Sequence, residues 1–437
     1  MGDILTEARF TRAAIPAPEG EPAWARRIRQ QAFAAYQALP IPSQETEEWR
    51  YTDVSGLDLE SFAPSAPGRV AETLDDVDPA ILEALGAVGD RAGLLIQHNA
   101  DTASAHLDPA LAEQGVRFLS LDRAIAEVPD LVEPYLHAAV PADRTKLTAL
   151  HAAFRTGGVF LHVPRDVRVE VPLQALTYLG ADGAAIFPHA LIVAEEGAEV
   201  TFIDRYVSPP LERALSDALV EIHLGRASRV RYVGLQDYGT GVTHLSVERA
   251  LVGPDAQLRS FGVAFGASMA RAEVEAMLIG DGGSSELLGV YFGDGDQHID
   301  HRSIQDHSGS RTSSDLLYKG ALRDRSAAIY TGTVIIEEGA HLCDAYQTNR
   351  NILLSEDARA HSVPNLEILT NDPTRCGHAA SVGPVDEDEL FYLQTRGISR
   401  EEAERLIVAG FFREVLDRVD LEEVREGIQA AIEAELS

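Results

Sequence analysis

Two side chains near the end of the chain have the chemistry of metal ligands. Cys376 and His378 are separated by Gly377, so on an extended strand their side chains would project from the same face. Thiolate and imidazole groups bind soft and borderline metal ions. The other cysteine, Cys343, lies 33 residues upstream, which does not give the paired four-ligand spacing of a zinc site. On spacing alone, a buried thiol beside a hydrogen-bonded histidine is the favoured interpretation.

A second group of candidate ligands falls in one strand-like segment, at His298, Asp300, His301, Asp306 and His307. On a strand, His298 and Asp300 would share a face, which makes a metal site with oxygen and nitrogen ligands conceivable. The favoured interpretation is again structural. It describes a polar strand edge whose histidines satisfy backbone groups.

Seven motifs follow one another in the last third of the chain. They are His307 with Arg311 to Ser314, Tyr318-Lys319-Gly320, Tyr330-Thr331-Gly332, Asp344 to Leu354, Pro364 to Ile368, Arg375 to Ala379, and Asp386 to Gly397. In this order they resemble the SufB/SufD family of iron-sulfur cluster assembly proteins. A set of ordered matches is far more specific than one short pattern.

The resemblance is closer to the SufD branch than to SufB. In SufB-like members, a Cys-Asp-Ser before a leucine pair supplies the main assembly cysteine. Here Arg350-Asn351-Ile352 stands in that place and offers no thiol. The chain departs from the usual SufD pattern at Gly377 and Ala379, where serine and glycine are more common, but both candidate ligands are kept.

This resemblance implies a fold and a role. The fold is a right-handed parallel β-helix, and the role is that of a non-catalytic scaffold subunit. Such a subunit pairs with a SufB-like paralogue through the β-helix edge, or forms a homodimer in isolation, and binds a SufC-like ABC ATPase through its C-terminal helices. Cys376 and His378 would then meet a transient iron-sulfur cluster at the subunit interface. A neutral His378 and a partly ionised Cys376 would favour that binding.

Composition sets bounds that agree with this role. The 437 residues are 45% hydrophobic and carry 37 basic and 69 acidic side chains, a formal charge of −32. Nucleic acid is not expected as a partner, because phosphate binding needs a basic footprint. With two cysteines and no apolar run approaching 18 residues, we expect a cytoplasmic protein without a membrane span.

The first part of the chain mixes helices and strands. Residues 21–39 have helical periodicity and end at Pro40-Ile41-Pro42. Trp49 and Tyr51 in the segment Glu47 to Thr52 are expected to anchor packing, and this segment also resembles the entry segment of SufD-like chains. Farther on, strands are expected at 93–97 and 116–121, and helices at 122–139 and 143–155. This predicts a small α/β region without a phosphate loop.

After Gly157-Gly158 the pattern becomes β and contains a repeat. Corners with the small residues Ala198, Ala227, Ala256 and Ser285 recur at 29, 29 and 29 residues. A fixed period in this range indicates stacked repeats, so we expect a solenoid in which each coil covers the last. A β-sandwich is the alternative, but it would require more two-residue hairpin turns.

From Asp386 the pattern is helical. Asp386 and Ser399 begin two segments typical of capping boxes, with Gly397 at the break. We therefore expect a helical hairpin that covers the open end of the solenoid, binds a partner, or both. Its candidate partner-binding residues, facing the ATPase, are Leu406, Ile407, Phe411 and Phe412. The predicted organisation is a helical and α/β region at 1–157, a β-helix core at 158–383 and a helical domain at 384–437.

Two other functions are compatible with the residues. A β-helix enzyme acting on polysaccharide would use paired carboxylates such as Asp294, Asp296 and Asp300 as acid and base. In a purely structural adaptor, Cys376 and His378 would only pack.

Overall fold

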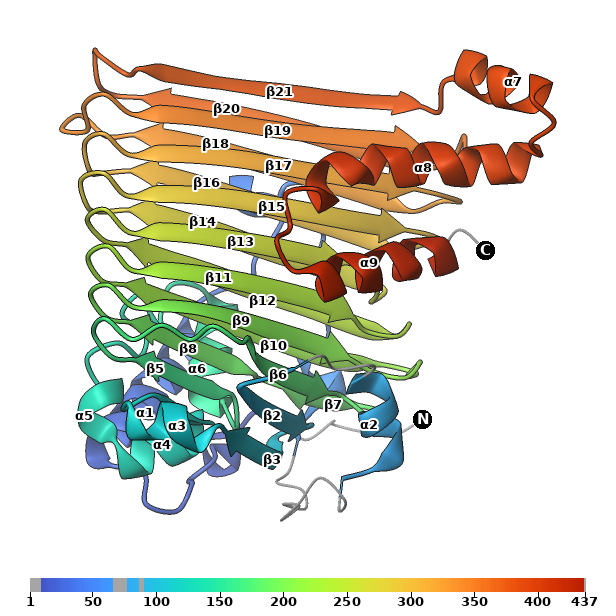
Figure 1. Ribbon diagram of the computed structural model, residues 1–437. Helices are drawn as coiled ribbons and strands as arrows, with labels where there is room; N and C mark the ends of the chain where they lie inside the picture. Colours follow the sequence, from blue (N-terminus) through green and yellow to red (C-terminus); the bar gives the residue numbers. More distant parts are fainter. Residues whose placement is uncertain (1–8, 66–76, 86–89, 436–437) are drawn as a thin grey trace, which may run out of the picture.

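The protein is a parallel β-solenoid closed at its base by helices and flanked by further helices near its C-terminus (Figure 1). The computed structural model describes residues 9–65, 77–85 and 90–435. Each coil contributes one strand to each of two sheets, so consecutive strands alternate between the sheets. Neighbouring strands in the stack are parallel, which rules out the antiparallel sandwich.

Sheet A and sheet B, as we name them, include the following strands. Sheet A contains β1 (Ala63–Pro64), β4 (Arg117–Ser120), β5 (Val159–Val163), β7 (Ala184–Ile186), β8 (His189–Ala194), β10 (Ala214–Leu224), β12 (Val242–Val252), β14 (Met269–Leu278), β16 (His298–His307), β18 (Ala327–Ile336) and β20 (Arg359–Ile368). Sheet B contains β2 (Gly93–His98), β3 (Asp101–Leu107), β6 (Leu173–Tyr178), β9 (Glu199–Val207), β11 (Arg229–Asp237), β13 (Gln257–Ala264), β15 (Ser284–Gly293), β17 (Ser313–Leu322), β19 (Asp344–Leu353) and β21 (Arg375–Pro384).

The helices gather at two places. Those near the base are α1 (Ala23–Ala38), α2 (Pro79–Leu85), α3 (Pro109–Glu113), α4 (Leu121–Glu127), α5 (Pro129–Val132) and α6 (Lys146–Phe154). The C-terminal ones are α7 (Glu387–Thr395), α8 (Arg400–Leu416) and α9 (Glu422–Glu435). In the described part of the chain, no helix is long and apolar enough to cross a membrane.

The repeat is real, but its exact period was wrong. Sheet B aligns Glu199, Arg229, Gln257, Ser284, Ser313, Asp344 and Arg375, so successive coils are 30, 28, 27, 29, 31 and 31 residues long. The buried partner of Ala198 is therefore Ser228, whereas Ala227 is exposed with φ of 55°. Turns of different length absorb the difference, because the strands stay in register while the corners grow or shrink.

The N-terminal region forms the base of the solenoid. Its strand β2 pairs in parallel with β6, and β4 pairs with β5, so both sheets continue across the boundary expected at residue 157. One helix expected over 122–139 is instead the two short helices α4 and α5. Val128, which precedes Pro129, has φ of −132°, because proline biases the residue before it away from the helical region.

The segment Glu47 to Thr52 runs along the outer face of sheet A. Trp49 is buried and lies 4.0 Å beneath the Arg271 guanidinium, which confirms its role as a packing anchor. Tyr51 stacks on His361 of β20, with ring centroids 6.0 Å apart. The N-terminal segment thus reaches the last coil.

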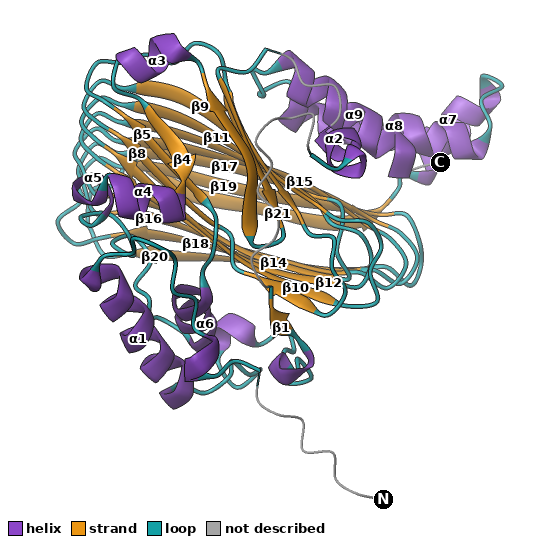
Figure 2. Ribbon diagram, turned by 90° about the horizontal axis from the view of Figure 1, so that it is seen from below, coloured by secondary structure: helices purple, strands orange, loops and turns teal. Residues whose placement is uncertain are grey.

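The C-terminal helices differ from the expected hairpin in number and in place. There are three helices, and α8 packs on the outer face of sheet B at β15 and β17, on the opposite side of the β-helix from α1 and α6 (Figure 2). The end of the solenoid beyond β20 and β21 is left uncovered by them (Figure 1). Lys319 of β17 fixes α8 by donating to the Phe411 carbonyl at 2.7 Å and pairing with Glu414 at 2.5 Å.

The interior of the solenoid contains two carboxyl groups. Asp204 accepts hydrogen bonds from Tyr206 (2.7 Å) and Tyr232 (3.1 Å), and Glu248 accepts one from Ser260 (2.6 Å) beside a cavity of about 70 Å³. Burial raises the pKa of Asp204 to about 6 and that of Glu248 to about 7. Both groups therefore favour the protonated form inside the fold.

We expect the Glu248→Gln variant to flatten the dependence of stability on pH. The unfolded chain ionises Glu248 near its ordinary pKa of 4.5, whereas the folded chain holds the proton up to about 7, so folding loses stability as pH rises between these values. The loss at pH 8 is at most roughly 3 kcal/mol. Urea unfolding at pH 4.5 and pH 8 measures it. Equal pH slopes for the variant and the parent protein would contradict the assignment.

Candidate functional site

Cys376 and His378 lie on β21, the last strand of sheet B. The register aligns Cys376 with Ala345 and His378 with Gln347, which are both buried and face the interior. Residues in register on parallel strands project to the same side. The expectation that the two ligands share one face is confirmed, and that face is the inner one at the open end of the solenoid.

The Cys376 thiol is half-buried. It packs, together with Leu366 of β20, against the cluster Val334, Ile336, Ala340, Cys343 and Ala345. Burial raises the pKa of Cys376, so the thiol rather than the thiolate is favoured in the isolated chain at neutral pH. The expectation of a partly ionised Cys376 is wrong for this state, because the thiol lies against apolar side chains.

His378 is exposed, in contrast to Cys376. Between them, a Cβ on Gly377 would lie 3.0 Å from the ring of Tyr346, so glycine lets that ring pack beneath the strand. Arg375 lies over the other part of the same ring, 5.2 Å from its centroid. The strand is thus supported from the adjacent coil, while the imidazole remains accessible.

The backbone of β21 offers further binding groups. The Arg375 and Val385 N–H groups bond to Cys343 and Leu353 of the adjacent coil at 3.2 and 3.3 Å. Backbone groups alternate in direction along a strand, so the even-numbered residues from Cys376 to Val382 turn theirs toward the open edge. An edge of this kind is a template for another strand.

Strand β20 supplies the facing wall, and the sequence reasoning did not single out its residues. Ser362 aligns with the buried Tyr330 and Leu366 with the buried Val334, so both face inward. The Ser362 hydroxyl is buried without a hydrogen-bond partner in the described structure. Period-two alternation from the Pro364 motif could have predicted these positions, but not that the two sheets end together.

The group around His298 is structural. Thr52 donates to Asp300 at 2.5 Å and lies 2.9 Å from the His298 Nε2 atom, and Arg271 forms a buried ion pair with Asp300. His301 faces the interior instead, between the rings of Tyr291 and Tyr318.

His307 is likewise a satisfied core histidine. Its two ring nitrogens lie 2.7 Å from Thr312 Oγ1 and 2.8 Å from Ser314 Oγ, and the side chain is buried. The family motif at His307 and Arg311 to Ser314 therefore includes a hydrogen-bonded corner of the β-helix. Asp306 only accepts from Ser308 at 2.8 Å.

The carboxylates required for a polysaccharide-active enzyme do not form a pair. Asp296 is bound by Arg325 at 2.5 Å in an exposed turn, and Asp300 is buried with Arg271 on β16. Asp294 lies in the same turn as Asp296, 3.8 Å from Arg323. Carboxylates neutralised by separate arginines are poor candidates for an acid and base pair.

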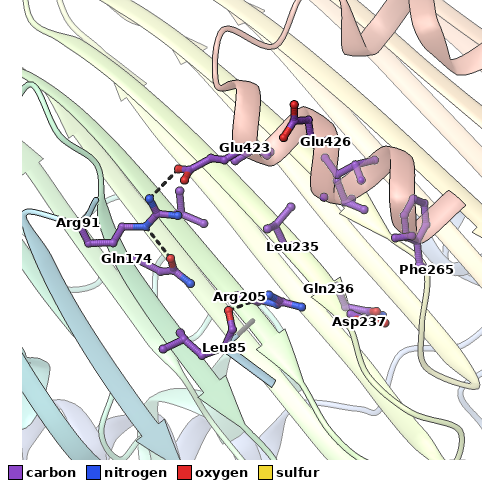
Figure 3. A pocket seen from close by; sticks show the side chains of 16 residues that line it. Leu85, Arg91, Gln174, Arg205, Leu235, Gln236, Asp237, Phe265, Glu423 and Glu426 are labelled. Atoms are coloured by element: carbon purple, nitrogen blue, oxygen red, sulfur yellow. Dashed lines mark hydrogen bonds and ion pairs between the residues drawn. The ribbon is translucent and has the colours of Figure 1, made fainter. Parts of the chain in front are cut away.

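A cavity of about 460 Å³ lies between α9 and the outer face of sheet B (Figure 3). Arg91 joins its two sides by bonding to Gln174 at 2.7 Å and Glu423 at 2.6 Å. Arg205 donates to the Leu85 carbonyl at 3.3 Å. The residues that line the cavity include neither histidine nor cysteine, so it does not offer ligands suited to a cluster.

The expected partner-binding residues lie in different environments along α8. Leu406 is 47% exposed, Ile407 and Phe411 are half-buried against the sheet, and Phe412 is 0% exposed. Phe412 packs in the core of this chain and offers no exposed side chain to a partner. The sequence reasoning passed over the exposed aromatic residues of α7, Phe391 and Tyr392, which are 67% and 57% exposed.

Comparison with known families matches these features to one group of proteins. The domain described as "SUF system FeS cluster assembly, SufBD core domain" matches residues 177–411, and the SufBD protein N-terminal region matches residues 92–175. The chain belongs to the SufBD family. It therefore has a role in iron-sulfur cluster assembly, and the resemblance seen in the motifs is confirmed.

Individual SufBD relatives support the assignment along the whole chain. The iron-sulfur cluster assembly protein SufD of Bacillus subtilis is 32% identical over 417 residues, which is 94% of each chain. A SufBD family protein of Mycobacterium leprae is 37% identical over 307 residues, covering 68% of this chain and 76% of the relative. One from Staphylococcus saprophyticus is 26% identical over 412 residues, covering 92% and 87%.

Proposed function

We propose that this chain is a non-catalytic, cytoplasmic scaffold subunit that pairs with a SufB-like paralogue and offers Cys376 and His378 to a nascent iron-sulfur cluster between them. The observation that carries the proposal is that both side chains lie on the inner face of the terminal strand β21. A thiolate and an imidazole are suitable ligands for iron. On this proposal the cluster is cargo and is passed on.

The open edges of β20 and β21 are the surface we assign to the paralogue. Continuing both sheets into a second β-helix would satisfy the outward N–H and C=O groups of the edge strands. The half-buried Cys376 would then lie at the joint, where a charged neighbour on the partner lowers a thiol pKa. A second copy of this chain would use the same edges when the paralogue is missing.

We assign the C-terminal helices to a SufC-like ABC ATPase. Helix α7 projects beyond the β-helix (Figure 1) and carries the exposed Phe391 and Tyr392, and Leu406 is exposed on α8. Exposed aromatic side chains are typical anchors of protein interfaces. Because Lys319 ties α8 to the β-helix, a movement of the ATPase would be transmitted to the solenoid.

Anaerobic affinity purification of the chain from its own cells tests this proposal. We expect a paralogous β-helix subunit and an ABC-type ATPase to co-purify, as identified by intact mass. The Ala380→Pro variant should lose the paralogue, because Ala380 is exposed and its N–H points to the open edge, where proline is tolerated by the fold but cannot pair. We expect the ATPase to remain bound.

The matched control is Ala380→Thr, which keeps the N–H group and should retain the paralogue. Recovery of the paralogue with Ala380→Pro at the wild-type level would exclude pairing through this edge. Recovery of a lone chain from wild-type cells, even at low salt, would overturn the assembly proposal as a whole.

A further inference from the structure

A cluster of histidines and a glutamate lies at the base of the solenoid, at the opposite end from β21. His137 follows helix α5, His189 begins β8, and Glu221 lies within β10. One ligand atom from each lies within 4.8 Å of the other two, the one such group found in the described part of the chain. His189 and Glu221 are fully buried and His137 is half-buried, so the cluster is reached from the His137 side.

Glu221 is held in place by the backbone. Its oxygens accept the N–H groups of His137 at 2.7 Å, Ala139 at 2.8 Å and Val140 at 2.9 Å. Three N–H donors suit the carboxylate form, which only accepts. They also fix His137, whose φ of 59° is uncommon for a residue other than glycine. The ring of His137 is thus positioned by the same carboxylate that it faces.

The hydrogen bonds of the histidines decide which ring nitrogens carry protons. His151 Nδ1 lies 2.8 Å from the Asp217 carbonyl, which can only accept, so Nδ1 donates and Nε2 keeps a lone pair. That lone pair lies 3.4 Å from His189 Nδ1, which must then donate to it. In the same way, His137 Nδ1 donates to the Val140 carbonyl at 3.3 Å.

This arrangement turns two nitrogen lone pairs toward a carboxylate. With Nδ1 protonated, His189 Nε2 keeps a lone pair 3.0 Å from the Glu221 Oε2 atom, and His137 Nε2 also keeps one. Two facing acceptors need a proton or a cation between them. Burial lowers the pKa of His189 well below its usual value, which disfavours the proton. The nearby Arg155 is already paired with Asp122 at 2.8 Å.

We propose that His137, His189 and Glu221 form a binding site for a divalent first-row transition-metal ion such as iron(II) or zinc(II). Two imidazoles and one carboxylate are a ligand set for ions of this class, with further positions left for water. The second ring nitrogens of both histidines are oriented by hydrogen bonds, as is usual for metal ligands. This site is independent of the Cys376 and His378 pair and of cluster assembly.

Cobalt(II) is a suitable probe, because its absorption spectrum reports the ligands. The titration is made anaerobically on full-length protein carrying Cys376→Ser and His378→Ala, so that the other candidate site cannot contribute. We expect one equivalent of cobalt to bind, with ligand-field bands and without a thiolate charge-transfer band. His137→Ala should weaken binding about 100-fold or more, since one of three ligands is lost.

Two controls keep the test decisive. His106→Ala removes an exposed histidine of β3 and should leave cobalt affinity unchanged. His137→Asn, whose side chain tolerates the left-handed backbone region, should retain the fold by circular dichroism and still lose affinity. Equal cobalt affinity for His137→Ala and the parent protein, or no binding by the parent protein at all, would overturn the proposal.

Discussion

Replacing Cys376 by serine should reduce the cluster assembly supported by this chain about 10-fold or more, the range seen when metal sites lose key groups. The serine hydroxyl is a hard ligand that suits iron poorly, whereas the change in side-chain volume is small. Because Cys376 is half-buried at the end of the core, we expect the fold to be preserved. The measurement is growth of a strain that depends on this system under iron limitation, together with cluster transfer by the purified complex.

Cys343 provides the matched control. It is fully buried in the same cluster and accepts a hydrogen bond from Thr312 at 3.2 Å, which makes it a structural cysteine. Cys343→Ala should therefore leave assembly largely intact, and His378→Ala should resemble Cys376→Ser. If Cys376→Ser supported full assembly, this chain would be a structural adaptor and would contribute no ligand.

The fold was predictable because β-helices repeat and because the motifs are specific. What could not be predicted is the register between coils. Ser285 matches the 29-residue spacing in the sequence, yet Ala256 aligns with Gly283, since the intervening turn is shorter than the others. A solenoid tolerates such changes in its corners, so the spacing of small residues indicates stacked coils without fixing which residues align.

The candidate site was predictable in direction but not in environment. Two residues two apart on a strand share a face whatever the fold, so the pairing of Cys376 and His378 needed no structure. The protonation of Cys376 depends on Leu366 and Val334, which come from other coils. In the same way, His137 and Glu221 are 84 residues apart in the sequence, and only the stacking of coils brings them together.

A helix with an apolar face presents a related ambiguity, and the largest expected change in stability follows from it. Phe412→Ala should lower the free energy of unfolding by about 3 to 5 kcal/mol, because a fully buried ring is removed from the contact between α8 and sheet B. Phe391→Ala removes a ring that is 67% exposed and should change stability by no more than about 0.5 kcal/mol. Urea unfolding of both variants measures the difference.

Binding of the ATPase should respond in the opposite order. If α7 anchors the partner, Phe391→Ala weakens binding about 10-fold or more while the chain stays folded, as expected for an interface anchor. Phe412→Ala affects binding only at denaturant concentrations or temperatures at which α8 detaches. Isothermal titration with the purified ATPase separates the two effects. Unchanged affinity for Phe391→Ala would move the docking surface away from α7, and the exposed Leu406 of α8 would then be the next residue to replace.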